Sequence, residues 1–231
     1  MLDPLKQAAD TRRLYHQIAD QIRGLIDKGG YAPGSRLPPE RDLAQQLGVS
    51  RPSVREALIA LEIAGVVEVR MGAGVYVCPP AQRQSLALAS LGESPSELMQ
   101  ARALFEGSVV ALACAKATAG DIVHLRAVLQ RMRQAVAQGQ SPIALDREFH
   151  VGLAAITGNG VLQRMTALLF DERHSPVSER LSARVESEYT WESAVQEHEA
   201  IVGALEQRDP LAAQTAMRLH LQESERRWVG A

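Results

Sequence analysis

One segment of this 231-residue chain differs in its apolar repeat from the rest. Over residues 66–77 apolar and polar side chains alternate, with VVEVR and VYV on either side of the glycine-rich MGAG, and this predicts a β-hairpin. Two prolines follow and end the second strand, because proline has no N–H to donate to a ladder. The other patterned segments repeat their apolar residues at helical spacing. The chain is therefore predicted to be mostly α, with one small antiparallel sheet.

Three helices are predicted ahead of the hairpin. They are expected over residues 11–28, 39–47 and 51–64. Gly48 supplies the turn between the second and third, and Ser50 is a good N-cap for the third. Helix, helix, turn, helix and hairpin is the order of a winged helix-turn-helix, in which the helix after the turn enters the major groove of DNA.

The third helix begins with two arginines that suit this function. Arg51 and Arg55 are four residues apart and share a face, opposite the apolar stripe of the same helix. A helix N-terminus attracts phosphate, and the glycine-rich hairpin tip can approach the sugar-phosphate backbone closely. Exposed arginine pairs are common on helices, so a helical hairpin with solvated arginines is the alternative. The order of the elements favours the DNA-binding interpretation.

Beyond residue 93 every patterned segment is helical. Helices are expected over residues 95–117, 118–138, 142–157, 160–174, 178–205 (one or two helices) and 210–228. We therefore predict a winged helix-turn-helix domain over 1–78, a linker over 79–93, and an all-α antiparallel helical bundle over 94–231.

Four polar side chains of the predicted bundle face its interior. Asp146 and His150 are four residues apart on one helix, so they point the same way. His198 and His220 each lie about ten residues from the break near Pro210, so antiparallel helices would place them side by side about 15 Å from the bend. Three imidazoles and a carboxylate suit Zn²⁺, Ni²⁺ or Mn²⁺. Core histidines satisfied by hydrogen bonds are an equally good interpretation at this point.

The remaining polar candidates are less constrained. His124 is interpreted as a surface residue of a helix, and His174 is left without a role. Arg102 can clamp a carboxylate ligand with its planar guanidinium, or form a salt bridge with Glu106 four residues on. The two interpretations of Arg102 are equally supported by spacing alone.

Composition excludes several classes of protein. The 46% apolar residues exclude a disordered chain, and two cysteines exclude a disulfide scaffold. The net charge of −2 argues against nucleic-acid binding, but it combines +1 over residues 1–80 with −3 over the rest. The N-terminus has no apolar signal-peptide core, and no apolar run is expected to reach the roughly 20 residues that span a bilayer. A cytoplasmic protein without a membrane partner is expected.

The first half of the chain resembles a known family. The stretch RLPPERDLAQQLGVSRPSVREALIALEIAGVVEVRMGAGVYV is similar to the DNA-binding domain of GntR-family bacterial transcription regulators, over residues 12–78. The resemblance implies DNA contacts by Arg41, Arg51, Ser53, Arg55 and Gly72. Pro52 and Met71 depart from residues that are common in the family, which bears on sequence preference.

The second half resembles the FCD ligand-sensing domain of FadR-type GntR regulators, in DREFHVGLAAITGN, EHEAIVGAL and AMRLHL. The resemblance covers about residues 94–229. It implies a divalent metal held by Asp146, His150, His198 and His220, and an effector held in part by Arg102. Segments such as ELMQARALFE are especially similar to hexuronate-utilisation regulators, which implies a sugar acid such as glucuronate, fructuronate or galacturonate. Lactate, pyruvate and other small organic acids are the near alternatives.

The resemblance implies a homodimeric transcription regulator, a repressor of a catabolic operon, which binds a palindromic site in double-stranded DNA and responds to a small carboxylate. It implies no enzyme activity. Two alternatives stay open on the residues alone. A metal with three histidines and an aspartate could activate water in an enzyme, although no base or nucleophile is evident beside it. The metal could also be purely structural in a DNA-binding protein.

Overall fold

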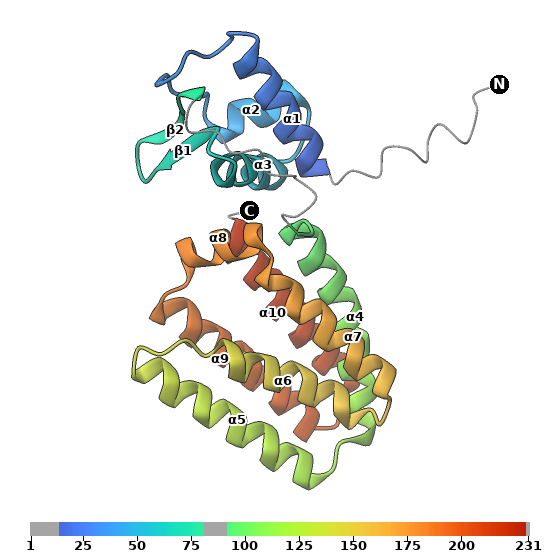
Figure 1. The fold of residues 1–231 in the computed structure, drawn as a ribbon. Helices are drawn as coiled ribbons and strands as arrows, with labels where there is room; N and C mark the ends of the chain where they lie inside the picture. Colours follow the sequence, from blue (N-terminus) through green and yellow to red (C-terminus); the bar gives the residue numbers. More distant parts are fainter. Residues whose placement is uncertain (1–13, 81–91, 230–231) are drawn as a thin grey trace, which may run out of the picture. The chain divides into compact units, whose positions relative to one another are not determined.

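The computed structural model describes residues 14–80 and 92–229, which fall into two compact units (Figure 1). One unit lies within Met1–Ser94 and includes Ser175–Val177, and the other comprises Pro95–His174 and Ser178–Ala231. The expected first turn of helix at residues 11–13 and most of the expected linker lie outside the described residues. The domain limits 1–78, 79–93 and 94–231 therefore stay a prediction.

The first unit has the predicted order of three helices and a hairpin. Its elements are α1 (Leu14–Asp27), α2 (Glu40–Leu47), α3 (Arg51–Ile63), β1 (Val67–Arg70) and β2 (Gly74–Val77). The strands pair antiparallel, with Val67 opposite Val77 and Arg70 opposite Gly74. Helices α1 and α3 pack on each other through fully buried apolar side chains such as Ile22.

Local chemistry fixes the turn between α2 and α3. Gly48 ends α2 in the left-handed conformation at φ 69°, which glycine adopts without steric cost. Two residues later Ser50 caps α3, and its side-chain oxygen accepts a hydrogen bond from the Ser53 amide at 3.2 Å. The start of α3 is therefore fixed by a short stretch of sequence.

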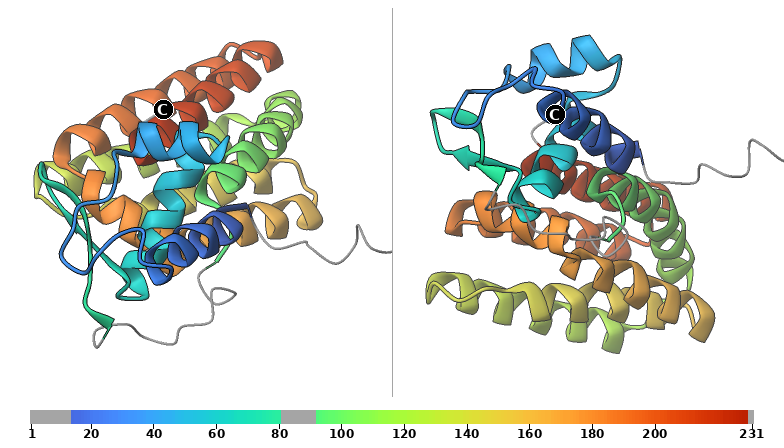
Figure 2. Two further views of the ribbon diagram at one scale, coloured as in Figure 1. Left: turned by 90° about the horizontal axis from the view of Figure 1, so that it is seen from above. Right: turned by 45° about the horizontal axis from the view of Figure 1, so that its top comes forward.

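The second unit is an all-α bundle, as predicted. Its elements are α4 (Pro95–Lys116), α5 (Ala119–Ala137), α6 (Ile143–Ile156), α7 (Gly160–Asp171), the 3-10 turn η4 (Glu172–His174), α8 (Pro176–Val185) from Ser178 onward, α9 (Glu188–Glu206) and α10 (Pro210–Val229). Figure 2 shows α5 lying alongside α6. Helix α10 packs along both α4 and α9, and α4, α5, α6, α9 and α10 surround one apolar core.

Helix α4 corrects one expectation. It is long and apolar enough to cross a membrane by length and composition, although the sequence analysis expected no such run. Between Leu98 and Ala115 its charged residues are Arg102 and Glu106, each only 2% exposed. Because 56% of the apolar window is buried inside the unit, α4 has the character of a core helix.

Candidate functional site

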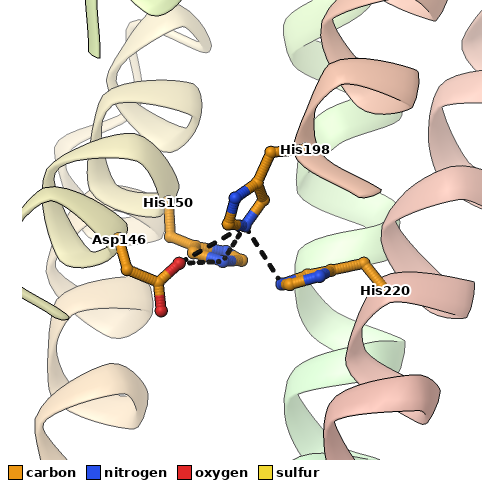
Figure 3. Close-up of side chains that lie close together, drawn as sticks. All are labelled: Asp146, His150, His198 and His220. Atoms are coloured by element: carbon orange, nitrogen blue, oxygen red, sulfur yellow. Dashed lines mark hydrogen bonds and ion pairs between the residues drawn. The ribbon is translucent and has the colours of Figure 1, made fainter. Parts of the chain in front are cut away.

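Four predicted side chains from three helices meet inside the second unit (Figure 3). Helix α6 contributes Asp146 and His150, α9 contributes His198, and α10 contributes His220. One nitrogen or oxygen atom of each lies within 4.8 Å of the other three. The three histidines are at most 3% exposed, and the helices have thus brought these residues together at the expected depth.

The ring nitrogens that face one another are all Nε2 atoms. His198 Nε2 lies 3.2 Å from His220 Nε2 and 3.4 Å from His150 Nε2. The same atom is 3.3 Å from Asp146 Oδ1. The four side chains therefore converge on one point.

Two glutamates stand behind the imidazoles. His150 Nδ1 lies 2.5 Å from Glu106 Oε2, and His220 Nδ1 lies 2.7 Å from Glu197 Oε2. An ionised carboxylate can only accept, so each Nδ1 donates its hydrogen. In the neutral imidazole the Nε2 lone pair then points to the centre of the cluster, which is the arrangement of metal-binding histidines.

The centre of the cluster is short of hydrogen-bond donors. Asp146 Oδ1 is buried and accepts no hydrogen bond within the described structure. Facing it are the Nε2 atoms of His198 at 3.3 Å and His150 at 3.5 Å, and the His150 Nε2 carries a lone pair in the neutral ring. A buried acceptor without a donor is unfavourable, and a cation satisfies several acceptors together. The residues present therefore fit a divalent metal ion.

Metal binding requires neutral imidazoles and an ionised carboxylate. The pKa directions of His198, His220 and Asp146 agree with this requirement, and that of His150 does not. Burial and the neighbouring His220 hold the pKa of His198 well below its usual range, and burial also lowers the pKa of His220. Burial opposes ionisation of Asp146, but the adjacent His150 outweighs it and the pKa of Asp146 lies well below its usual range. Burial lowers the pKa of His150, yet Glu106 and Asp146 reverse this effect and the pKa is raised.

Sequence reasoning missed Arg173, which holds the other oxygen of Asp146. Its Nη1 lies 2.9 Å from Asp146 Oδ2, and its guanidinium stacks on the rings of Phe170 and Trp228 at 5.0 and 4.9 Å. Because Arg173 comes from η4, no helical spacing could relate it to Asp146.

Glu197 and Arg227 form a second layer that the sequence analysis also missed. Arg227 holds Glu197 with two hydrogen bonds of 2.6 and 2.9 Å, and Glu197 in turn holds His220. Glu197 directly precedes His198 in the sequence. This adjacency could have indicated its role, since it places a carboxylate near the neighbouring helix. Its partner on α10 could not be identified from spacing.

A cavity of about 60 Å³ adjoins the cluster. Asp146, His150 and His220 line it, and so do three arginines and two tryptophans, namely Arg102, Arg173, Arg227, Trp191 and Trp228. The cavity therefore joins candidate metal ligands to cations and aromatic surface.

Arg102 combines the two interpretations that its spacing allowed. Its Nε donates to Glu106 Oε1 at 2.7 Å, so the salt bridge is present. Its Nη2 is buried without a hydrogen-bond partner, and the residue also lines the cavity. The other two histidines of this unit, His124 and His174, lie apart from the cluster, with side chains that are 59% and 52% exposed.

The first unit presents most of the predicted DNA-contacting residues at its surface. Arg41 has an 83% exposed side chain, and Arg51 is exposed at the start of α3. Ser53 is half-buried within the cap of α3, where its hydroxyl lies 2.8 Å from that of Ser50. Gly72 lies at the exposed hairpin tip with φ 70°, so its left-handed backbone rather than close packing favours glycine there.

Arg55 is placed differently from a freely solvated arginine. Its Nη2 lies 2.6 Å from Glu40 Oε2 and its Nε lies 3.0 Å from Glu40 Oε1, so the guanidinium grips the carboxylate with two groups. Its side chain is only 24% exposed. The pair links α2 to α3, and Arg51 is the more exposed member of the predicted arginine pair.

Comparison with known proteins agrees with both units. Residues 14–77 match the model of the bacterial regulatory proteins of the gntR family, and residues 97–223 match the FCD domain. The Uxu operon transcriptional regulator of Escherichia coli K12 is 36% identical, covering 96% of this chain and 90% of the relative. The Exu regulon transcriptional regulator of the same organism is 34% identical, covering 94% and 85%.

Two further comparisons extend this result. The transcriptional repressor NanR of Cronobacter sakazakii is 31% identical, covering 91% of this chain and 83% of that protein. The solved structure of E. coli McbR/YncC is similar with a TM-score of 0.52 at 22% identity, covering 93% and 96%, which supports the fold.

A winged helix-turn-helix joined to a helical unit with a cavity beside buried histidines defines a DNA-binding regulator with an effector domain. The chain belongs to the gntR family of bacterial regulatory proteins, and its second unit is an FCD domain. It is a transcription regulator rather than an enzyme, in keeping with the relatives it matches.

Proposed function

We propose that the chain senses a small carboxylate, in particular a sugar acid, through a divalent metal held by Asp146, His150, His198 and His220. Zn²⁺, Ni²⁺ and Mn²⁺ all suit three nitrogen ligands and one oxygen ligand. A bound metal with open positions would supply Lewis acidity for oxygen donors. The observation that carries the proposal is the convergence of these four ligand atoms within 4.8 Å beside a cavity.

Arg102 is proposed to hold the carboxylate of the effector. It lines the cavity, and its Nη2 is a buried donor without a hydrogen-bond partner. A guanidinium and a carboxylate match in geometry and charge, and their hydrogen bonds are stronger than those between neutral groups. Glu106 contacts Arg102 through its Oε1 and His150 through its Oε2, and so orients both side chains. Arg102 is thus linked to the metal ligands by a single carboxylate.

The names of the relatives support a sugar acid as the effector class. Regulators of the Uxu operon and the Exu regulon align with nearly the whole chain, and the resemblance to hexuronate-utilisation regulators points to glucuronate, fructuronate or galacturonate. Lactate and pyruvate are smaller and are also accommodated by metal and arginine chemistry. The cavity of about 60 Å³ has room for only a few water molecules, so a six-carbon acid requires its lining side chains to move.

We propose that Arg41, Arg51, Ser53, Arg55 and Gly72 contact DNA, with Arg51 reading a base edge in the major groove. The remaining members are proposed to contact phosphate and sugar. Arg55 would act from its ion pair with Glu40, which fixes the direction of its guanidinium.

A cytoplasmic homodimer would place two such units on a palindromic operator, because the symmetry of the protein is repeated in the DNA. Effector binding would shift the population between two arrangements of the dimer, and so relieve repression of a catabolic operon. Such a shift requires different effector affinities in the two arrangements.

The test is a thermal-shift panel on the purified full-length chain, loaded in turn with Zn²⁺, Ni²⁺ and Mn²⁺ or treated with chelator. Hexuronates and small carboxylates are added to each form. A true effector at 100 times its Kd stabilises the protein by about 2.7 kcal/mol. We expect this gain in a metal-loaded form and not after chelation.

Two matched variants separate the alternatives. His150→Ala should abolish the response to acids, whereas His124→Ala, at an exposed histidine of α5, should retain it. If no acid shifts any metal form, the sensing proposal is wrong. If chelation unfolds the second unit while no acid alters DNA binding, the metal is purely structural.

A further inference from the structure

Three buried polar atoms in the wall of the cavity have no hydrogen-bond partner among the described residues. They are Asp146 Oδ1, Arg102 Nη2 and Trp191 Nε1. The first is an acceptor that fits the proposed metal, and the second is a donor that fits the proposed carboxylate. The third is the indole N–H of Trp191, and neither the metal nor the carboxylate accounts for it. Because a buried indole N–H usually has a hydrogen-bond partner, we expect an acceptor in the adjoining space.

Two other uncharged polar residues of the wall already have partners. Thr190 Oγ1 donates to the Ser187 carbonyl at 2.9 Å, and Ser224 Oγ accepts from Arg227 Nη2 at 2.9 Å. Trp191 therefore differs from them, since its buried donor is not used within the described structure.

The backbone that carries Trp191 is held in place by a capping box. Helix α9 begins after Ser187, whose Oγ accepts from the Thr190 amide at 3.3 Å while Thr190 Oγ1 accepts from the Ser187 amide at 2.9 Å. The Trp191 amide donates to the Ser187 carbonyl at 3.0 Å. The first turn of α9 is thus fixed by its own residues, and a ligand that binds Trp191 has little backbone to order.

The spacing along α9 sets the distance between Trp191 and the metal cluster. Trp191 and His198 are seven residues apart, which is almost two turns, so they share one face of the helix. Their Cα atoms are separated by about 10 Å along the helix axis. A ligand with its carboxylate at the cluster must therefore be long to reach Trp191.

We propose that Trp191 is a specificity-determining residue, whose indole N–H donates a hydrogen bond to an oxygen at the end of the effector remote from its carboxylate. A six-carbon sugar acid has five carbon–carbon bonds of about 1.5 Å each and oxygen atoms at both ends, so it spans most of the distance. A three-carbon acid has two such bonds and is too short for both contacts. The inference rests on the proposed function and adds selection by length.

A role in packing alone does not account for the indole N–H. A buried donor without an acceptor is unfavourable, whereas phenylalanine would cover the same apolar neighbours without this cost. The contrast between tryptophan and phenylalanine at position 191 therefore isolates the proposed hydrogen bond.

The test measures Kd values for acids of graded length on the metal-loaded full-length protein, from thermal shifts over a range of acid concentrations. The acids are glycerate, threonate and the three hexuronates, with three, four and six carbons. In the wild type the affinity should rise sharply between threonate and the best hexuronate. In Trp191→Phe the affinity for that hexuronate should fall about 2- to 12-fold, the usual effect of losing one hydrogen bond, while that for glycerate should not change.

Tyr189→Phe is the matched control, because it also removes one polar hydrogen from an aromatic side chain in the first turn of α9. Tyr189 is 77% exposed, so this variant should bind the hexuronate as the wild type does. Competition with a chromophoric chelator should give equal metal affinities for the wild type and both variants. Such equality separates the loss of a hydrogen bond from damage to the metal cluster.

Each contrary result has a distinct meaning. Equal hexuronate affinities for the wild type and Trp191→Phe overturn the inference, whereas a wild type that still responds to hexuronates leaves the sensing proposal intact. An equal loss of affinity for glycerate and hexuronate also overturns it, since Trp191 would then only support the wall. If Trp191→Phe fails to fold, the length series on the wild type decides, and glycerate binding as tight as that of every hexuronate overturns the inference. If no acid shifts any metal form, the sensing proposal fails and the inference fails with it.

Discussion

At the scale of single residues, the partner of each Nδ1 determines what the opposite nitrogen can bind. Glu106 and Glu197 take the Nδ1 hydrogens of His150 and His220, which leaves the Nε2 atoms free to accept. His198 has no such carboxylate, and its Nδ1 is buried without a hydrogen bond. The two glutamates should therefore govern the affinity for a metal although neither is proposed to touch it.

Glu197→Gln should weaken metal binding about 10- to 100-fold, which is the usual effect of losing a carboxylate behind a metal-binding histidine. An amide holds His220 less strongly and no longer pairs with Arg227. Competition with a chromophoric chelator measures the change. Glu206→Gln on the same helix is the control, because Glu206 pairs with Arg126 at the surface. Equal metal affinities for the two variants would show that Glu197 does not support the site.

Glu106 should also make stability depend on pH. Its pKa is lowered from 4.5 to about 2, because burial, which opposes ionisation, is outweighed by Arg102 and His150. A lowered pKa in the folded state contributes stability that is present above about pH 4.5 and is lost as the pH falls towards 2.

We therefore compare urea unfolding of the chelated wild type with that of Glu106→Gln between pH 5 and pH 2.5. The contribution is of the order of 3 kcal/mol. The wild type should lose more stability than the variant as the pH falls, since glutamine does not titrate. Parallel pH profiles would contradict the assignment.

At the scale of elements, helix α3 and the packed pair of helices α9 and α10 were both predictable because their signals are local. Ser50 and Gly48 define the start of α3, and the break before Pro210 fixes the relative depth of His198 and His220. The ion pair between Arg55 and Glu40 was not predictable. It joins two residues that are 15 apart in sequence on neighbouring helices, and the helical repeat gives the face of a residue but not its partner across a turn.

Arg51→Ala should weaken binding to a DNA duplex selected from a random library by the wild type, by about 1–3 kcal/mol, and should relax specificity at one base position. Fluorescence anisotropy at several salt concentrations measures both. The control is Arg126→Ala, which removes an exposed arginine of α5 from the second unit. Unchanged affinity and specificity for Arg51→Ala would exclude its proposed place in the groove.

At the scale of the whole molecule, the sequence was sufficient for the winged helix, the helical bundle and the clustering of the four candidate ligands. It could not supply Arg173, which comes from a short turn, or the cavity, whose lining is drawn from several helices. The stretch expected as one or two helices over residues 178–205 is divided into α8 and α9. Local caps and spacing predict elements well, whereas side chains that meet through tertiary packing carry no local signal.

Metal removal should act on one unit only. Chelation should lower the melting temperature of the second unit, since a ligand bound only by the folded state stabilises it. The first unit, whose core is formed by α1, α2, α3 and the hairpin, should melt unchanged. Calorimetry of chelated and reloaded protein checks this, and a loss of both transitions on chelation would contradict it.

The net charge of the side chains around the cavity suits a monovalent acid as the effector. Four carboxylates lie in or directly behind its wall, from Glu106, Asp146, Glu186 and Glu197. Three guanidiniums accompany them, from Arg102, Arg173 and Arg227. With neutral histidines the described wall carries one negative charge, so the proposed divalent ion makes it singly positive. A monovalent acid then restores neutrality in a medium of low dielectric constant. Other anions would therefore compete with the effector for the metal-loaded cavity. Acetate or phosphate in the buffer would raise the sugar-acid concentration needed for a response.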